Sequence, residues 1–298
     1  MDRLVLGTAQ LGLEYGHTNI TGMPTAIQAL SIINYALEKG IKTFDTARSY
    51  GTAENVLGQI NSNDTITIIT KLGKFNYNAS ESILKNNIDK SIEESCKALQ
   101  VSNLDTLLIH DFEHFNNKII WKHLLSLQEK NKIGKLGISV YNVEEAIIAL
   151  KDININHIQL PINIIDSQWN NDIFLELVKQ RSDVSIHARS IFLQGILLND
   201  TSFWPKNHDS AFYVNTLDNL MVDFGFSNKV ELCFSYVKSL KWIDGIIMGV
   251  DTLLQLKKNI ELFNVRTMDE EKIQKIRSIF NATPKSIVDP RLWMQTIN

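Results

Sequence analysis

Cysteine is scarce in this sequence, since Cys96 and Cys233 are the only two among 298 residues. Two cysteines cannot form the disulfide framework of a small secreted domain, and these two are too far apart in the chain for a zinc knuckle. A chain of this length buries enough apolar surface without cross-links. We therefore expect a protein of the reducing cytoplasm with an ordinary hydrophobic core and two buried thiols.

Long runs of one kind of residue are also missing. The chain has 30 lysine and arginine residues against 33 aspartate and glutamate residues, and no basic run favours the phosphates of a nucleic acid. Its apolar stretches, such as residues 245–250, are far shorter than the ~20 residues of a membrane-spanning helix. Residues 1–7 lack the features of a secretory signal. The sequence thus predicts a globular cytoplasmic protein without nucleic-acid or membrane partners.

The chain does contain a repeated alternation of short apolar runs and longer segments whose apolar residues have helical spacing. The runs cover residues 4–7, 41–45, 66–71, 106–110, 135–139, 157–160, 184–189 and 245–249. The helical segments cover residues 24–39, 53–59, 80–99, 121–130, 143–150, 172–179, 229–241 and 252–263. Eight such units predict an α/β fold, the (β/α)8 or TIM barrel, with functional residues at the carboxyl ends of the strands.

The remaining segments fit around such a barrel. The polar stretch 199–212 lies between the seventh and eighth runs and is predicted to loop over the mouth of the barrel. Residues 269–280 have the spacing of an additional helix, and residues 281–298 form a tail. No linker divides the chain, so we predict a single barrel domain over residues 1–298, with the extra helix and tail at 269–298.

Ionisable side chains end three consecutive apolar runs. Asp45 ends the second run, Lys71 the third and His110 the fourth, and Tyr50 follows Asp45 by five residues. A charge at the end of a buried strand costs several kcal/mol unless it is paired, so Asp45 and Lys71 are expected to form an ion pair. An ammonium beside a phenol predicts a lowered pKa for Tyr50, which could then protonate a carbonyl oxygen. A purely structural ion pair is the alternative.

With these four residues in this order, the sequence resembles the aldo/keto reductase superfamily, from residues 7–12 to the helix after the eighth strand. The resemblance implies a TIM barrel that carries an Asp, Tyr, Lys, His tetrad and binds an extended nicotinamide cofactor. It implies that Asp45 and Lys71 tune Tyr50 as general acid and base, and that His110 orients the substrate carbonyl. The cofactor carries the hydride, and the protein supplies the acid and the positioning.

The same resemblance implies which residues hold the cofactor. Gly7 and Thr8 lie in the first loop of the barrel. Ser139 and Gln159 match the pair that holds the nicotinamide carboxamide, although Val140 stands where the family usually has Asn. One carboxamide contact of the family is therefore not expected here.

The seventh unit matches the loop that follows the nicotinamide and the pyrophosphate in the family. The matching residues are Arg189, Ser190, Gln194 and Gly195. Arg189 stands where many members have a tyrosine that stacks on the nicotinamide, and a guanidinium plane can also stack on a ring.

The eighth unit departs from the family at the adenosine end. Gly249, Asp251, Gln255 and Asn259 stand in the segment that usually grips the adenosine 2'-phosphate with basic residues. The carboxylate of Asp251 would repel a phosphate but could accept a hydrogen bond from a ribose hydroxyl. Asn259 matches the Asn that contacts adenine, and Gln255 is a second candidate. The cofactor is thus NADP or NAD, with NAD(H) as the hypothesis, although the lysines at 257–258 could still reach a phosphate.

Aromatic residues in the loops are candidates for the substrate pocket. They are Tyr15, Phe112, Trp169 and Phe192, of which Phe112 and Trp169 follow the fourth and sixth strands. Packing is the alternative for each. The four-residue spacing of His110 and His114 suits a metal, but no third ligand is in register, so no metal is predicted.

The sequence therefore predicts an NAD(P)(H)-dependent oxidoreductase that interconverts an aldehyde or ketone, with sugars among the candidates, and its alcohol. An enzyme that works towards oxidation, or that uses the cofactor transiently in an epimerising or lyase-like reaction, is an alternative. A second alternative is a non-catalytic barrel that binds the cofactor as a regulatory or scaffold subunit. The substrate, the direction of the reaction and the oligomeric state do not follow from the sequence.

Overall fold

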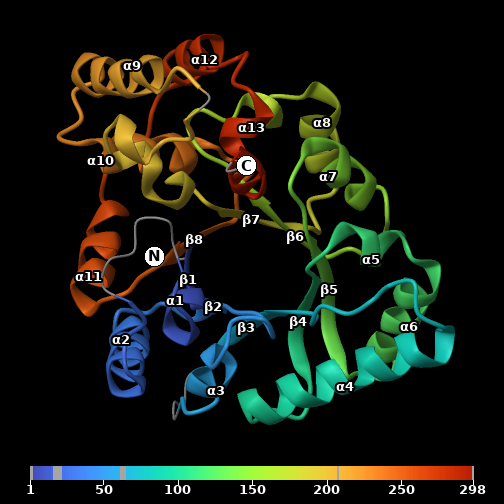
Figure 1. Cartoon of the computed structure of the whole chain (residues 1–298). Helices are drawn as coiled ribbons and strands as arrows, with labels where there is room; N and C mark the ends of the chain where they lie inside the picture. The colour runs from blue at the N-terminus through green and yellow to red at the C-terminus, as the bar shows by residue number, and fades with distance from the viewer. Residues whose placement is uncertain (1–2, 16–21, 61–64, 207, 297–298) are drawn as a thin grey trace.

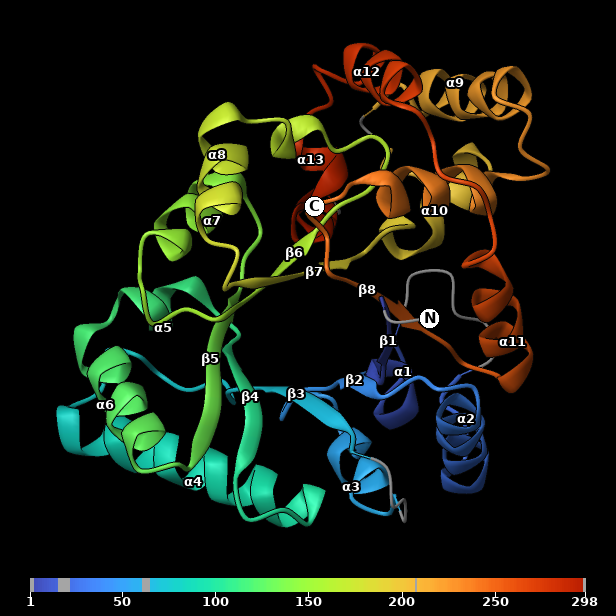
Figure 2. The ribbon, with the colours of Figure 1, turned by 180° about the vertical axis from the view of Figure 1, so that it is seen from behind.

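In the described part of the chain, eight parallel strands close into a barrel in sequence order, with helices around it (Figure 1, and from behind in Figure 2). The computed structural model describes residues 3–15, 22–60, 65–206 and 208–296. The strands are β1 (Leu4–Gly7), β2 (Thr43–Asp45), β3 (Thr67–Lys71), β4 (Leu104–Ile109), β5 (Ile133–Ser139), β6 (His157–Pro161), β7 (Ser185–Arg189) and β8 (Gly245–Gly249). The predicted (β/α)8 barrel is confirmed.

The helices agree with the predicted segments except at short or polar stretches. They are α1 (Ala9–Gly12), α2 (Ala26–Glu38), α3 (Ala53–Leu57), α4 (Glu81–Leu99), α5 (Phe112–Asn116), α6 (Lys118–Glu129), α7 (Val143–Leu150), α8 (Asp172–Gln180), α9 (Ser210–Asp223), α10 (Lys229–Ser239), α11 (Leu253–Leu262), α12 (Glu270–Ile279) and α13 (Lys285–Val288). The 3-10 helices are η1 (Ser167–Trp169), η2 (Leu193–Leu198), η3 (Thr201–Phe203) and η4 (Pro290–Thr296). The sequence does not predict α1, α5, α9 or α13.

The stretch 199–212, predicted to loop over the mouth of the barrel, contains helical turns that the sequence does not predict. This stretch contains η3 and the start of α9, which is capped by Asp209 through a hydrogen bond from the Phe212 N–H. Polar residues near the start of a helix hide its apolar spacing, because they serve the unpaired N–H groups of the first turn.

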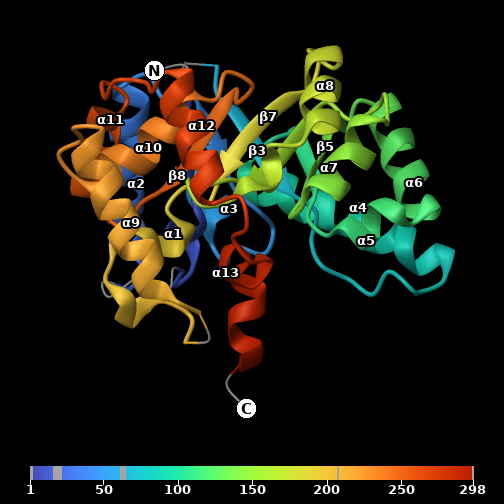
Figure 3. The ribbon, with the colours of Figure 1, turned by 90° about the horizontal axis from the view of Figure 1, so that it is seen from above.

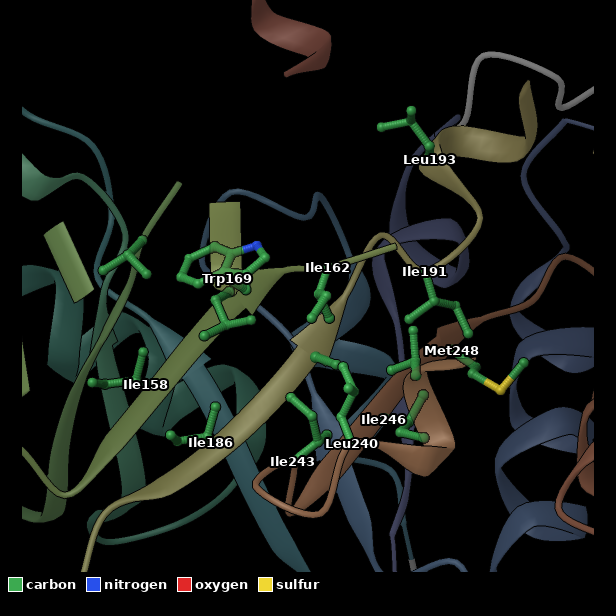
Figure 4. Packing of buried hydrophobic residues seen from close by; sticks show 14 of the residues in the cluster. Ile158, Ile162, Trp169, Ile186, Ile191, Leu193, Leu240, Ile243, Ile246 and Met248 are labelled. Carbon is green, nitrogen blue, oxygen red and sulfur yellow. The ribbon is translucent and has the colours of Figure 1, made fainter. Parts of the chain in front are cut away.

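Apolar side chains fill the space between the strands and the helices outside them. Those of Ile158 on β6, Ile186 on β7 and Ile246 on β8 pack in one cluster with Leu240 and Ile243 from the connection into β8 (Figure 4). A strand that is buried on both faces has a continuous run of apolar residues, and for this reason the strands can be predicted from the sequence. No described helix has both the length and the hydropathy of a bilayer-spanning segment.

The two cysteines lie in this helical layer and form no disulfide. Cys233 on α10 is buried, and burial raises the pKa of its thiol to about 12. Cys96 on α4 is only partly buried, which corrects the expectation that both thiols are enclosed.

The strand register brings the candidate functional residues to one rim of the barrel. Gly7, the last residue of β1, pairs with Asp45 on β2 and with Gly249 on β8. Ser139 at the end of β5 pairs with Gln159 on β6. Residues that are far apart in the sequence therefore surround one opening at the carboxyl ends of the strands.

The C-terminal segment lies at the same opening. In Figure 3, α13 and the chain that follows it project from one face of the ring of strands. Arg291 on η4 places its Cζ 3.4 Å from the centroid of the Tyr141 ring, in the loop after β5. The tail predicted from the sequence is thus a structured wall beside the mouth.

The loop after β2 is anchored by a buried carboxylate. Glu54 on α3 is 1% exposed, accepts a hydrogen bond from Thr70 Oγ1 at 2.7 Å and forms an ion pair with Arg48 at 3.3 Å. Arg48 also pairs at 3.1 Å with Glu94 on α4, whose side chain is 43% exposed. The backbone N–H of Arg48 donates to the carbonyl oxygen of Lys71 at 3.3 Å. Glu54 thus ties this loop to β3.

We expect Glu54→Gln to lower the free energy of unfolding by about 2 kcal/mol, because it removes the charge of a buried carboxylate that is bonded to both Arg48 and Thr70. Glu94→Gln removes the other partner of Arg48, which solvent screens, and should cost less than about 0.5 kcal/mol. Urea unfolding of the two variants and the parent at neutral pH measures both changes. Equal losses would contradict the anchoring role.

Two histidines face each other near the start of β6 and β7, away from the rim. The ring centroids of His157 and His187 are 4.2 Å apart, and His157 Nε2 and His187 Nδ1 have no partner in the described part of the chain. A Cβ at Gly245 would lie 2.6 Å from the His187 ring, so the ring occupies the space beside a glycine. Burial lowers the pKa of His187 from 6.5 to about 4, and burial followed by the charge of His187 lowers that of His157.

This pair predicts a loss of stability in mild acid. In the unfolded chain these histidines are protonated near pH 6.5, whereas His187 in the folded protein is protonated only near pH 4. The stability that is present above pH 6.5 is therefore lost as the pH falls towards 4. The loss has an upper limit of about 1.4 kcal/mol per pH unit for each ring. His187→Leu should flatten the fall in urea-derived stability between about pH 7 and about pH 5. The same slope in the variant and the parent would refute this origin.

Candidate active site

A buried ion pair lies at the centre of the site. Lys71 at the end of β3 is 1% exposed, and its Nζ donates to Oδ1 and Oδ2 of Asp45, each at 2.8 Å. It also donates to the carbonyl oxygen of Thr46 at 2.9 Å, so each N–H of the ammonium has an acceptor. Gln159 Nε2 donates to Asp45 Oδ2 at 2.6 Å. The expected ion pair is present, and its position is fixed from three strands.

Tyr50 is held beside this pair by the loops after β1 and β2. The Nζ of Lys71 lies 4.9 Å from the centroid of the Tyr50 ring, and the His110 ring stands edge-on with its centroid at 6.3 Å. A Cβ at Gly12 would lie 2.1 Å from the Tyr50 carbonyl oxygen, and one at Gly51, where φ is +55°, would lie 2.1 Å from that of Gly12. Glycine at both positions lets the two backbones meet and sets the place of the phenol.

The Tyr50 hydroxyl holds its proton more tightly than the sequence predicted. Burial raises the pKa of Tyr50, Asp45 raises it further, and Arg189 lowers it. The prediction of a lowered pKa is wrong for this structure, because burial of the phenol disfavours its anion and the nearby Asp45 carboxylate adds to this effect. Tyr50 therefore presents a protonated hydroxyl, as a proton donor requires.

His110 presents a neutral ring to the same space. Burial, followed by the charges of Lys71, Lys74 and Arg189, lowers the pKa of His110 to about 3. A neutral imidazole carries one N–H donor and one acceptor. The ring can therefore bind a substrate oxygen without contributing a charge.

One cavity of about 1050 Å³ joins this tetrad to the N-terminal part of α11. Asp45, Tyr50 and His110 line it, while Lys71 lies behind Asp45 and Tyr50. The twelve residues predicted to bind the cofactor line it too: Gly7, Thr8, Ser139, Gln159, Arg189, Ser190, Gln194, Gly195, Gly249, Asp251, Gln255 and Asn259. The fold thus brings together residues from five strand ends and two helices.

The cavity suits a nicotinamide dinucleotide in size and in donor chemistry. Its volume is at the upper end of the range for ligand pockets, roughly 300–1000 Å³. Uncharged hydroxyls and amides, such as those of Thr8, Ser139 and Asn259, line it and can bind sugar hydroxyls and a carboxamide. Asn228 and Gln255, at the N-terminal ends of α10 and α11, also border it, where helix dipoles favour phosphate.

At the α11 end, Asp251 and Gln255 are bound to each other. The Asp251 backbone N–H donates to Gln255 Oε1 at 2.6 Å, and Gln255 Nε2 donates to Asp251 Oδ2 at 3.4 Å. Lys258 lines the cavity, whereas the Nζ of Lys257 lies 5.2 Å from the centroid of the Tyr35 ring. Among the described residues, two carboxylates, those of Asp251 and Glu261, and one lysine, Lys258, therefore line this end of the cavity.

Two of the four aromatic residues predicted for the substrate pocket line the cavity. Tyr15 and Phe192 line the cavity, but Phe112 and Trp169 do not. Phe112 begins α5 and packs on Phe115 with ring centroids 5.8 Å apart. Trp169 is buried in the apolar cluster of Figure 4, and its Nε1 donates to Asp166 at 3.1 Å. Both side chains turn back onto the barrel because their loops are folded into helical turns.

His114 has a structural place rather than one in the cavity. Its ring stacks on Phe75 with centroids 4.5 Å apart, and its Nε2 donates to the Phe75 carbonyl oxygen at 3.1 Å. Among the described residues, no cluster of three metal-ligating side chains occurs.

Several lining residues are not predicted from the sequence, among them Gln10, Lys74, Tyr141 and Asn228. Asn228 had a signal, because Asn followed three residues later by Glu is typical of a helix start and places the residue at a loop end. Lys74 and Tyr141 follow strand ends by two or three residues, and nothing in the sequence states which way such side chains turn.

The comparisons with known proteins agree with this geometry. The model of the aldo/keto reductase family matches residues 3–281. L-galactose dehydrogenase of Arabidopsis thaliana is 23% identical over 272 residues, which are 84% of this chain and 83% of that protein. D-arabinose 1-dehydrogenase of Saccharomyces cerevisiae is 33% identical over 156 residues, 47% of this chain and 43% of the yeast protein.

Solved structures share the fold. An aldo-keto reductase from Bacillus halodurans in its holo form has a TM-score of 0.73 at 20% identity, covering 93% of this chain and 91% of that chain. The glycerol dehydrogenase of Gluconobacter oxydans has a TM-score of 0.71 at 21% identity, covering 97% and 94%. With a family match over nearly the whole sequence, the chain belongs to the aldo/keto reductase family and is an NAD(P)-dependent oxidoreductase of carbonyl and alcohol groups.

Proposed function

We propose that Tyr50 is the general acid and base of this oxidoreductase, with His110 as the group that orients the substrate. The observation that carries this proposal is the fixed ammonium of Lys71, bound to Asp45 at 2.8 Å and 4.9 Å from the Tyr50 ring. In reduction, Tyr50 gives its proton to the carbonyl oxygen, and Lys71 stabilises the phenolate that remains. In oxidation, the same phenolate accepts the proton of the alcohol.

The other lining residues hold the cofactor, which supplies or accepts the hydride when bound. Ser139 and Gln159 support the nicotinamide end, Ser190, Gln194 and Gly195 the pyrophosphate, and Asn259 the adenine, with Gly7, Thr8, Gly249 and Gln255 along the wall. We assign Arg189 to the substrate end instead, because its guanidinium lies 4.4 Å from the centroid of the Tyr141 ring.

The substrate is proposed to be a polyhydroxylated aldehyde or ketone, or the matching alcohol. Two similar proteins support this proposal. L-galactose dehydrogenase matches most of the sequence, and the glycerol dehydrogenase shares the fold over nearly the whole chain. The scarcity of cysteine and its unpaired state support a cytoplasmic site for this reaction.

Tyr50→Phe should lower kcat for carbonyl reduction by at least about a hundredfold, because it removes the proton donor while keeping the ring. Cofactor affinity, followed by quenching of protein fluorescence, should change little. Tyr35→Phe, at a partly buried residue of α2 that does not line the cavity, is the matched control and should keep both properties. Reduction at close to the parent rate would overturn the assignment, and cofactor binding without turnover in the parent would favour the scaffold alternative.

The cofactor is proposed to be NAD(H) in preference to NADP(H). The carboxylate of Asp251 faces the cavity at the α11 end, where it would repel a phosphate and could accept a hydrogen bond from a ribose hydroxyl. Lys258 would attract a phosphate at this end, but its ammonium is exposed to solvent, so the attraction is weak.

We therefore expect a larger kcat/KM for NADH than for NADPH. Asp251→Ser should raise kcat/KM for NADPH by about tenfold, since one like-charge contact is removed. Lys258→Gln should lower the use of NADPH, whereas Lys257→Gln, whose ammonium lies outside the cavity, should not alter the cofactor ratio. A large advantage of NADPH in the parent enzyme would contradict the proposal.

A further inference from the structure

The Tyr50 end of the cavity contains two cations that form no ion pair within the described part of the chain. Lys74, in the loop after β3, and Arg189, at the end of β7, both line the cavity. Both act on His110, whose pKa they lower together with Lys71. Lys71 differs from them because it is bound to Asp45.

The carboxylates that line this cavity and the cavity of about 70 Å³ beside it are already occupied or lie at the other end. Asp45 holds Lys71. Asp289 holds Arg291 through bonds from Nε at 2.8 Å and from Nη2 at 2.6 Å. The remaining two, Asp251 and Glu261, belong to the α11 end. The substrate end therefore has an excess of positive charge.

The position of Lys74 is built into the loop that carries it. The Gly73 N–H donates to Ser91 Oγ at 3.0 Å. On the other side of Lys74, the Phe75 carbonyl oxygen accepts a hydrogen bond from His114 Nε2 at 3.1 Å, and the two rings stack. The backbone on both sides of Lys74 is thus held, so that this exposed residue stays at the edge of the cavity.

The guanidinium of Arg189 lies over an aromatic ring, and its Nε forms no hydrogen bond within the described part of the chain. Its Cζ lies 4.4 Å from the centroid of the Tyr141 ring, and its Nη2 donates to the Val140 carbonyl oxygen at 3.1 Å. Its Nε is buried without a partner, and Arg291 lies over the same ring at 3.4 Å. A guanidinium has five N–H donors and binds carboxylates and phosphates through pairs of them.

From this arrangement we propose that the substrate carries an anionic group, a carboxylate or a phosphate, which binds between Lys74 and Arg189 while its carbonyl group meets Tyr50 and His110. The proposal rests on the proposed function, since it names the class of substrate for that site. A sugar acid or a sugar phosphate fits it, whereas a neutral sugar leaves both cations uncompensated in a partly closed cavity.

The first test uses two aldehydes of similar shape, of which one is anionic and the other is neutral. The parent enzyme is assayed with para-carboxybenzaldehyde and with its methyl ester, at saturating cofactor. We expect kcat/KM to be about tenfold higher for the carboxylate, through KM, and this ratio to fall as salt is added. Reduction of the ester at an equal or higher rate rules out a carboxylate substrate and leaves the proposed function intact. Reduction of neither aldehyde counts against the proposed function.

Variants then test which residues cause the preference. Lys74→Gln should reduce the carboxylate-to-ester ratio about threefold, as expected for an exposed charge, and Lys74→Arg should restore it. Arg189→Gln should reduce the ratio further. Lys275→Gln on α12, an exposed lysine paired with Asp223, is the matched control and should leave the ratio as in the parent. An unchanged ratio in both cavity variants would refute the assignment.

The source of the negative charge is distinguished by a second pair of substrates, D-glyceraldehyde and its phosphate ester. A larger gain for the phosphate than for the benzoate indicates a phosphorylated substrate, and the reverse indicates a carboxylate. If kcat/KM is no higher for the anionic member of either pair, both a carboxylate and a phosphate substrate are excluded.

Discussion

The buried ion pair between Asp45 and Lys71 is the interaction on which the rest of the site depends. Two charges enclosed by the barrel are tolerated only because each ammonium proton has an acceptor and because Gln159 donates to the carboxylate. The pair therefore requires three strand ends in one register. Once it is formed, the charge of the lysine has a fixed distance from the Tyr50 ring, and the phenol has a neighbour that can stabilise its anion.

Tyr50 itself is placed by the backbone rather than by its side chain. The loops after β1 and β2 meet at Gly12 and Gly51, and Glu54 holds the second loop to β3 through Thr70. The site thus combines a rigid charge from the strands with a loop whose position is set by two glycines and one buried carboxylate. Such layering explains how a barrel made of uniform units can carry one asymmetric centre.

The barrel and the central ion pair could be predicted from the sequence, because they depend on residues whose neighbours in space follow from strand order. Asp45 and Lys71 end adjacent strands, so their pairing needed only the barrel. The pKa of Tyr50 could not be predicted in the same way, since it depends first on burial of the phenol and then on the charges of Asp45 and Arg189. Phe112 and Trp169 were misplaced because a loop residue can face the cavity or the core, and short helical turns that the sequence does not reveal decide between the two.

The C-terminal segment has a practical consequence for any work with this enzyme. Because η4 brings Arg291 onto Tyr141 at the mouth of the barrel, residues 290–296 border the face through which ligands enter. An affinity tag or fluorescent protein fused there would share that entrance and add its own charges to it. A fusion at the other terminus would be the better choice whenever rates or affinities for charged ligands are to be compared.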